Sequence, residues 1–160
     1  MDGINQGATI ADRFREVMLN GTFVAETNFK AQLSTLNWEQ ATQQVGTLNT
    51  IAALTSHIHY YIAGVLQVLQ GGTLDIKDKY SFDFPPVTSQ QDWDDVLEKL
   101  WRDTERFAVV LSQMTEQKLN EDFAGKKYGS YQRNIDAMIE HCYYHLGQIV
   151  LIKKLIAVKQ

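Results

Sequence analysis

Apolar residues recur every three or four positions in several stretches of the chain, the spacing that places them on one face of an α-helix. The most apolar stretch begins near Thr47 and ends at Gly71, and because it is apolar almost all round its central turns we expect it to be deeply buried. A second stretch follows Ser89, a predicted N-cap, and a third runs from Ser130 to about Val158. One side of the helix after Ser89 is charged and is expected to face water: Asp94, Glu98, Arg102, Asp103 and Glu105.

The N-terminal part of the chain has a weaker pattern. Thr9 and Asp12 have the spacing of a capping box, which predicts that the first helix starts near Ile10 and that residues 1–8 are flexible. The pattern then breaks at an Asn-Gly pair, and a second capped start at Asn37 predicts a short helix. The chain is therefore expected to contain four main helices and one short one.

Two connections separate the long predicted helices. Residues 73–88 are rich in aromatic side chains and contain Pro85-Pro86, which prevents a helix from continuing, while residues 115–129 read as a polar linker. Four helices bury their apolar stripes most simply by packing together. We therefore predict one all-α domain over residues 1–160, a four-helix bundle in which the 73–88 connection crosses over. Its aromatic residues are expected to plug one end, with a lid across a cleft as the alternative.

Composition excludes some classes of function. The chain has a net charge of −4 and no dense cluster of Lys and Arg, so we expect no binding of nucleic acid. It lacks an apolar run long enough for a membrane span and a signal-peptide pattern at its start, so we expect a cytoplasmic protein with no membrane partner. Its one cysteine, Cys142, cannot form an internal disulfide and is expected to be a buried structural thiol.

The four histidines of the chain all lie in the two most apolar predicted helices. His141 and His145 are four residues apart, so their rings lie on one helix face, about one turn apart, where two imidazoles can bind one ion. A protein core tolerates a histidine whose ring nitrogens have partners. Two on one inward face without nearby carboxylates would leave nitrogens unpaired, at about 1–3 kcal/mol for each group. This pair therefore predicts a metal site.

A third ligand has to come from another helix, because catalytic zinc sites use three protein ligands and leave one position to water or substrate. His57 and His59 are the candidates. They lie two residues apart, or about 200° round the helix, so only one of them can face His141 and His145. Periodicity alone does not decide between them.

Two familiar metal motifs are absent. No histidine has the Glu three residues earlier that a ferritin-like di-iron site requires, and the residues between His141 and His145 lack the carboxylate of the zinc-protease motif. Tyr61 and Tyr144 are candidates for hydrogen bonds to a substrate or to metal-bound water, with packing as the alternative role. Glu140 is the nearest carboxylate in sequence and is expected on a solvated face.

Two segments resemble the DinB-like superfamily, which includes the YfiT-like metal-dependent hydrolases and the bacillithiol S-transferases. They are Leu54–Ile58 and His141–Ile149, and the resemblance spans most of the chain. It implies a bundle that commonly dimerises and binds a divalent metal, zinc or nickel first, with iron and manganese as further candidates. Carried over, the ligands are His57, His141 and His145, and His59 does not coordinate. The resemblance also implies that Gly147 permits close helix packing and that Gln148 packs or hydrogen-bonds near a helix interface rather than at the ion.

The resemblance implies a metal-dependent enzyme in which the ion activates water or a thiol. The reaction would be hydrolysis of a small molecule or transfer of a low-molecular-weight thiol to an electrophile. The alternative is a metal-binding or dimerising bundle without catalysis, favoured by the lack of a clear general base near the histidines. A bundle without metal is the third possibility.

Overall fold

The computed structural model describes residues 5–158, and within this range it is helical with no β-strand. The α-helices are α1 (Gln6–Arg15), α2 (Phe29–Leu33), α3 (Trp38–Thr42), α4 (Ile51–Leu69), α5 (Gln90–Ser112), α6 (Glu116–Asn120) and α7 (Tyr131–Val158). A π-helical turn at Glu16–Asn20 continues α1, and short 3-10 turns occur at Asp78–Tyr80 and Lys126–Tyr128. The predicted all-α class is confirmed. None of the described helices is long and apolar enough to cross a membrane.

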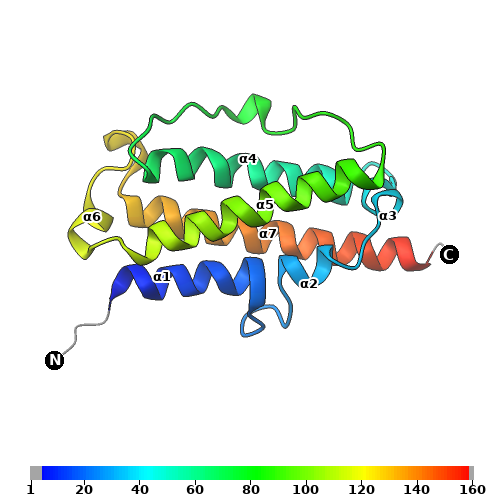
Figure 1. Ribbon diagram of the computed structural model, residues 1–160, viewed down its shortest axis with the longest axis horizontal. Helices are drawn as coiled ribbons and strands as arrows, with labels where there is room; N and C mark the ends of the chain where they lie inside the picture. The colour runs from blue at the N-terminus through cyan, green and yellow to red at the C-terminus, as the bar shows by residue number, and fades with distance from the viewer. Residues whose placement is uncertain (1–4, 159–160) are drawn as a thin grey trace.

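The four longest segments pack around a common apolar core. Helix α5 lies against both α1 and α4, α4 also lies against α7, and the π-helical turn after α1 contacts α7. In Figure 1 helices α4 and α5 run in one direction along the molecule, while α1 and α7 run in the other. The core contains fully buried side chains from every one of these helices, among them Phe14, Ile58, Phe107 and Ile149.

Most predicted helix starts after the first are close to the observed ones. The hydroxyl of Ser89 accepts a hydrogen bond from the amide of Asp92, and the hydroxyl of Ser130 accepts one from the amide of Arg133. Asn37 and the third residue of α3 form a complete capping box. These side chains satisfy amides that a helix leaves without partners in its first turn, which is why the starts could be located.

The first predicted helix start is wrong. The side chain of Asn5 accepts a hydrogen bond from the amide of Ala8, so α1 begins at Gln6 and Thr9 lies inside the helix. Residues 6–8 of the segment expected to be flexible are therefore helical, and residues 1–4 lie outside the described residues. The segment predicted as a polar linker after α5 also contains a short helix, α6, with Leu119 fully buried.

The crossover segment, residues 70–89, joins α4 to α5 and runs along the length of the molecule, as predicted (Figure 1). It lies against the side of α4. The hydroxyl of Tyr60 accepts a hydrogen bond from the amide of Lys77 and donates one to its carbonyl oxygen, at 2.9 and 3.0 Å. A Cβ at Gly64 would lie 2.3 Å from Cγ2 of Ile76, so glycine allows this close approach. The prediction that the segment plugs an end of the bundle is therefore wrong.

The expectation that Asp103 faces water is also wrong. Its side chain is buried, and Oδ2 lies 2.7 Å from Nε2 of His59 on α4. Arg102 donates a hydrogen bond from Nε to Oδ1 at 3.1 Å. Burial raises the pKa of Asp103, but the hydrogen bonds from Arg102 and His59 outweigh it and hold that pKa below its usual value. The carboxylate therefore stays charged and links α4 to α5.

Candidate metal centre

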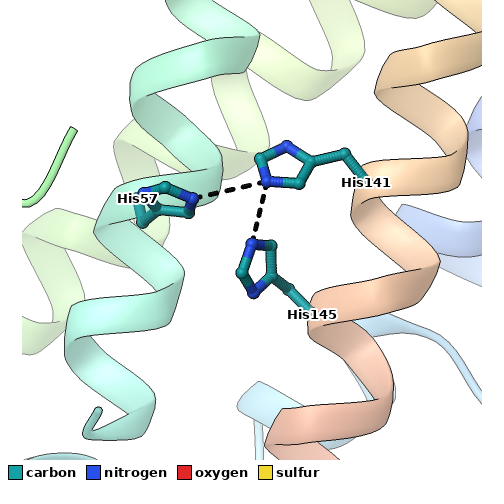
Figure 2. Close-up of side chains that lie close together, drawn as sticks. All are labelled: His57, His141 and His145. Atoms are coloured by element: carbon teal, nitrogen blue, oxygen red, sulfur yellow. Dashed lines mark hydrogen bonds between the residues drawn. The ribbon is translucent and has the colours of Figure 1, made fainter. Parts of the chain in front are cut away.

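Helices α4 and α7 bring three histidines together, His57 from α4 and His141 and His145 from successive turns of α7 (Figure 2). We refer to them as the histidine cluster. One ligand atom from each ring lies within 4.8 Å of the others. Nε2 of His141 is 3.3 Å from Nε2 of His57 and 2.8 Å from Nε2 of His145. The three rings therefore direct the same nitrogen toward one point, a group that can hold a metal ion.

Hydrogen bonds at the far side of two rings fix which nitrogen carries the proton. Nδ1 of His57 lies 3.2 Å from the carbonyl oxygen of Ser81, which can only accept, so Nδ1 donates. Nδ1 of His145 donates in the same way to Oε1 of Gln148 at 2.7 Å. Nε2 of each neutral ring then carries a lone pair toward Nε2 of His141, which can donate to only one of them. A cation between the rings would satisfy all three nitrogens.

A proton on one of these rings does not supply this positive charge at neutral pH. Burial lowers the pKa of His141 to about 4, and repulsion from His145 and His57 adds to the effect. Burial also lowers the pKa of His57 and of His145, against smaller opposite effects from their hydrogen bonds. The rings are therefore neutral at pH 7, the form in which imidazole binds a metal.

The donor set fits a first-row divalent metal. Two nitrogens bound to zinc at about 2.0–2.1 Å in a tetrahedral arrangement are about 3.3 Å apart. The His57–His141 pair has this separation, whereas the His141–His145 pair is closer by several tenths of an ångström. Imidazole suits zinc, nickel, copper and iron, so the donors do not select one metal.

A cavity of about 590 Å³ opens beside the histidine cluster and reaches His141. Its walls come from α4, the crossover segment, the loop before α7 and α7 itself, and most of them are apolar: Tyr61, Val65, Leu74, Ile76, Lys77, Asp78, Phe123, Tyr128, Asn134, Ala137, Met138 and His141. This volume is within the range of small-molecule sites. A small molecule in this cavity would lie next to a metal held by the cluster.

The cavity wall holds one carboxylate, Asp78, that the sequence did not point to. The hydroxyl of Tyr61 donates a hydrogen bond to its Oδ1 at 2.8 Å. The ring of Tyr61 meets those of His57 and His141 edge to face, with centroids 5.1 Å apart in both pairs. Burial and the bond to Asp78 raise the pKa of Tyr61, so its hydroxyl keeps its proton. Asp78 is 21 residues from His57 in an irregular connection, and no spacing rule relates the two.

A sequence profile of the DinB superfamily matches residues 24–149, more than three-quarters of the chain. The chain belongs to the DinB superfamily. Searches of curated proteins and of solved structures found no match. The profile match covers α4 and the part of α7 that carries His141 and His145, and it confirms the resemblance that the histidine motifs had indicated.

His59 lies outside the histidine cluster of this DinB-superfamily chain, because its Nε2 is bonded to Asp103 on the other side of α4. Cys142 is fully buried and its burial raises the pKa of the thiol, as expected of a structural cysteine. Tyr144 is largely exposed, and its ring touches that of His145 edge to face with centroids 4.9 Å apart. Tyr144 therefore lies on the outer side of the cluster.

One of two predictions near the second histidine motif needs correction. Gln148 was expected to pack or hydrogen-bond near a helix interface rather than at the ion, and its amide oxygen accepts a hydrogen bond from Nδ1 of His145. Gly147 was expected to permit close helix packing, but it is exposed, and a Cβ built there would meet nothing within 4 Å. Within one chain, therefore, Gly147 packs against no neighbouring helix.

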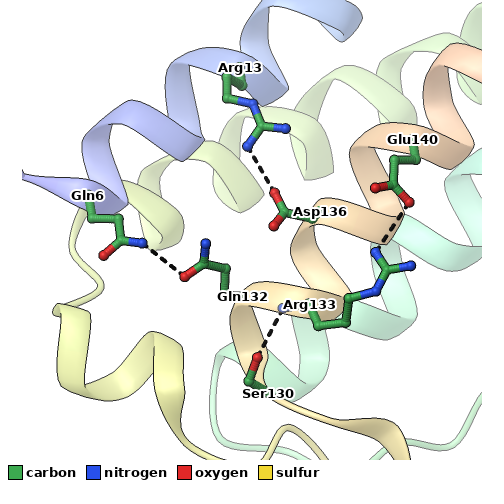
Figure 3. Close-up of polar contacts among 7 residues, drawn as sticks. All are labelled: Gln6, Arg13, Ser130, Gln132, Arg133, Asp136 and Glu140. Carbon is green, nitrogen blue, oxygen red and sulfur yellow. Dashed lines mark hydrogen bonds and ion pairs between the residues drawn. The ribbon is translucent and has the colours of Figure 1, made fainter.

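The carboxylate nearest in sequence, Glu140, is turned away from the cluster. Its Oε2 forms an ion pair with Nη1 of Arg133 at 3.2 Å on the exposed side of α7, as expected for a solvated residue (Figure 3). Contacts with α1 fix the first turns of α7: Arg13 bonds to Asp136 and Gln6 to Gln132, both at 2.9 Å. These polar contacts stabilise the helix that carries two of the three histidines.

Proposed function

We propose that this protein is a metal-dependent enzyme that uses His57, His141 and His145 to hold one divalent ion, zinc or nickel first, with iron and manganese as further candidates. Its reaction is hydrolysis of a small molecule or transfer of a low-molecular-weight thiol to an electrophile. One observation supports this proposal most. Three Nε2 atoms converge next to a cavity, and hydrogen bonds at Nδ1 of His57 and of His145 fix the orientation of two of the rings.

Each part of the site has a role in this proposal. The histidine cluster holds the ion, which when bound lowers the pKa of a coordinated water or thiol. Asp78, the carboxylate on the cavity wall, would serve as the base for this chemistry, and Tyr61 orients it through the 2.8 Å hydrogen bond. The apolar walls bind the body of the substrate and exclude water from around the reacting atoms.

Metal content is the first test. Purified wild type is expected to contain one equivalent of a divalent metal by elemental analysis, and His141→Ala is expected to lose it. His59→Gln is the matched control, because it changes a histidine of α4 outside the cluster and can still donate a hydrogen bond to Asp103. Circular dichroism checks that all variants are helical. Wild type without stoichiometric metal would rule out a metal-dependent function.

Catalysis needs a separate test. Metal-loaded protein is incubated with bacillithiol or a similar thiol and a panel of electrophiles, and with a panel of hydrolase substrates. Turnover that requires His57 and falls in Asp78→Asn, while that variant keeps its metal, would support the proposed roles. A metal-loaded wild type that is inactive across both panels would favour the non-catalytic alternative.

A homodimer is the second part of the proposal, supported by the outer face of α7. Tyr144, Gly147, Leu151 and Leu155 recur at helical spacing, and the three large side chains are 65%, 55% and 37% exposed. A glycine between large apolar residues lets a second helix approach closely, and the same face on a second copy would make a two-fold symmetric contact. Light scattering should then show a dimer in wild type and a monomer in Leu151→Glu.

A further inference from the structure

The crossover segment is attached to one face of α4. The residues of α4 that contact it recur every three or four positions: His57, Tyr60, Tyr61, Gly64 and Gln67. At the far end from the cluster, the side-chain Nε2 of Gln67 donates to the carbonyl oxygen of Thr73 and to the carboxylate of Asp75. The segment is therefore held along its length by specific polar contacts as well as by packing.

The contact at the other end of this face is made with the histidine cluster itself. The Ser81 carbonyl accepts the hydrogen bond from Nδ1 of His57, and Ser81 is only 5% exposed. The ring of Phe82 stacks on the His57 imidazole, with centroids 4.2 Å apart and planes 14° apart. Phe82 is nevertheless 43% exposed. The position of the Phe82 ring is therefore explained by its contact with the His57 imidazole and not by burial in the core.

We propose that the crossover segment is a positioning element of the metal centre, so that metal binding at His57 and docking of residues 77–83 stabilise each other. This inference rests on the proposed metal site but not on the proposed reaction. The Ser81 carbonyl fixes the tautomer that presents Nε2 to the ion, and the Phe82 ring fixes the plane of the imidazole. Phe82 and Ser81 act through His57, so they are positioning residues.

The coupling has to act in both directions. A ring whose Nε2 binds a cation donates a stronger hydrogen bond from Nδ1, because the ring carries more positive charge. Metal binding therefore favours the docked segment, and by linkage the docked segment raises metal affinity by the same factor. The segment also supplies Leu74, Ile76, Lys77 and Asp78 to the cavity wall. Loss of the metal would thus loosen one wall of the proposed substrate site.

Metal affinity tests the first direction. The dissociation constant for Zn²⁺ is measured by competition with a chromophoric chelator. Phe82→Ala is expected to raise it at least about tenfold, the lower end of what loss of a ligand's supporting contacts costs. Tyr80→Ala is the matched control, since Tyr80 is 45% exposed, lies two residues away in the same segment and should change the constant by less than about twofold. Phe82→Tyr keeps the stacked ring and should restore wild-type affinity.

A second variant perturbs the segment without altering any residue of the site. Gly64→Ala places a methyl group where Ile76 packs, so it pushes the segment off α4 and should also weaken zinc binding. The unfolding midpoint of each metal-free variant shows that the fold is retained. Wild-type affinity in both Phe82→Ala and Gly64→Ala would overturn the proposal.

Hydrogen exchange tests the other direction. The amide of Lys77 donates to the hydroxyl of Tyr60 on α4 at 2.9 Å, so its exchange reports release of the segment from α4. The amides of Tyr80, Ser81 and Asp83 are bonded within the segment at 2.9–3.0 Å, so their exchange reports the order of this turn. One equivalent of zinc should slow hydrogen exchange at these amides in wild type by a factor at least as large as the loss of zinc affinity in Phe82→Ala. Zinc bound without any slowing would overturn the coupling alone. Failure of wild type to bind zinc, nickel, iron or manganese would overturn both the coupling and the metal-dependent function.

Discussion

The metal-free protein is expected to lose stability as pH falls from about 6.5 to 4, and His141 should cause much of that loss. Its pKa is lowered from 6.5 to about 4, mainly by burial. Below pH 6.5 the unfolded chain takes up a proton that the folded chain does not accept until about pH 4. The free energy of unfolding therefore falls with pH throughout this window, and the loss from His141 is complete below it.

The size of the effect follows from the same pKa. For a fully buried group, a fall from 6.5 to about 4 corresponds to about 3 kcal/mol. His141 is only partly buried, so screening by solvent reduces the expected total to about 2 kcal/mol, of which about half is lost between pH 6.5 and 5. Carboxylates with lowered pKa values, such as Asp103, contribute stability that is lost only at more acidic pH, below their ordinary pKa near 4.

The assay is urea unfolding in the presence of a chelator at several pH values between 7.5 and 5, for wild type and His141→Gln. Wild type should lose about 1 kcal/mol more than the variant over this range. The free energy of unfolding of the variant should still depend on pH to a smaller extent, because the pKa values of His57 and His145 are also lowered. Equal losses in the two proteins would refute the argument that burial keeps His141 neutral.

Three further substitutions test single contacts. Gln148→Leu removes the oxygen that orients His145 and should weaken zinc binding at least about tenfold in a chelator competition; unchanged affinity would contradict its orienting role. Asp103→Asn should lower the free energy of unfolding by about 1–3 kcal/mol in urea without changing zinc affinity, and an effect on zinc would show that the two regions are linked. Trp93→Phe removes a buried hydrogen bond from the indole and should cost about 2 kcal/mol in the same assay, whereas a neutral effect would mean that water replaces the donor.

The features that the sequence predicted best depend on neighbours in the chain. A helix cap such as Ser89 or Ser130 involves an amide three residues away, and the pairing of His141 with His145 is set by one turn of helix. Such relations are fixed by backbone geometry before any tertiary contact forms. The starts of α3, α5 and α7 and two members of the histidine cluster could therefore be located without a structure.

The failures involve contacts between distant segments. Asn5 and Thr9 are both good N-caps, and packing favours the earlier one. A Cβ at Gly7 would lie 2.5 Å from the carbonyl oxygens of both Leu111 and Met114, so α1 approaches the end of α5 closely at this residue. Gly7 makes this contact from within a helix that extends back past Thr9. No local rule contains this information, because propensity is a weak preference that tertiary packing overrides.

The choice between His57 and His59 shows the same limit at the site itself. The two residues lie on opposite sides of α4, and what separates them is the partner that each one meets. Asp103 on α5 holds Nε2 of His59 at 2.7 Å, while Ser81 in the crossover segment holds Nδ1 of His57 and leaves its Nε2 directed at α7. A carboxylate partner uses the nitrogen that a metal would need, whereas a carbonyl partner on the opposite nitrogen prepares the ring for one. The difference between a structural histidine and a candidate ligand in this chain is therefore set by α5 and by an irregular connection, whose contacting residues lie 44 and 24 positions along the chain from His59 and His57.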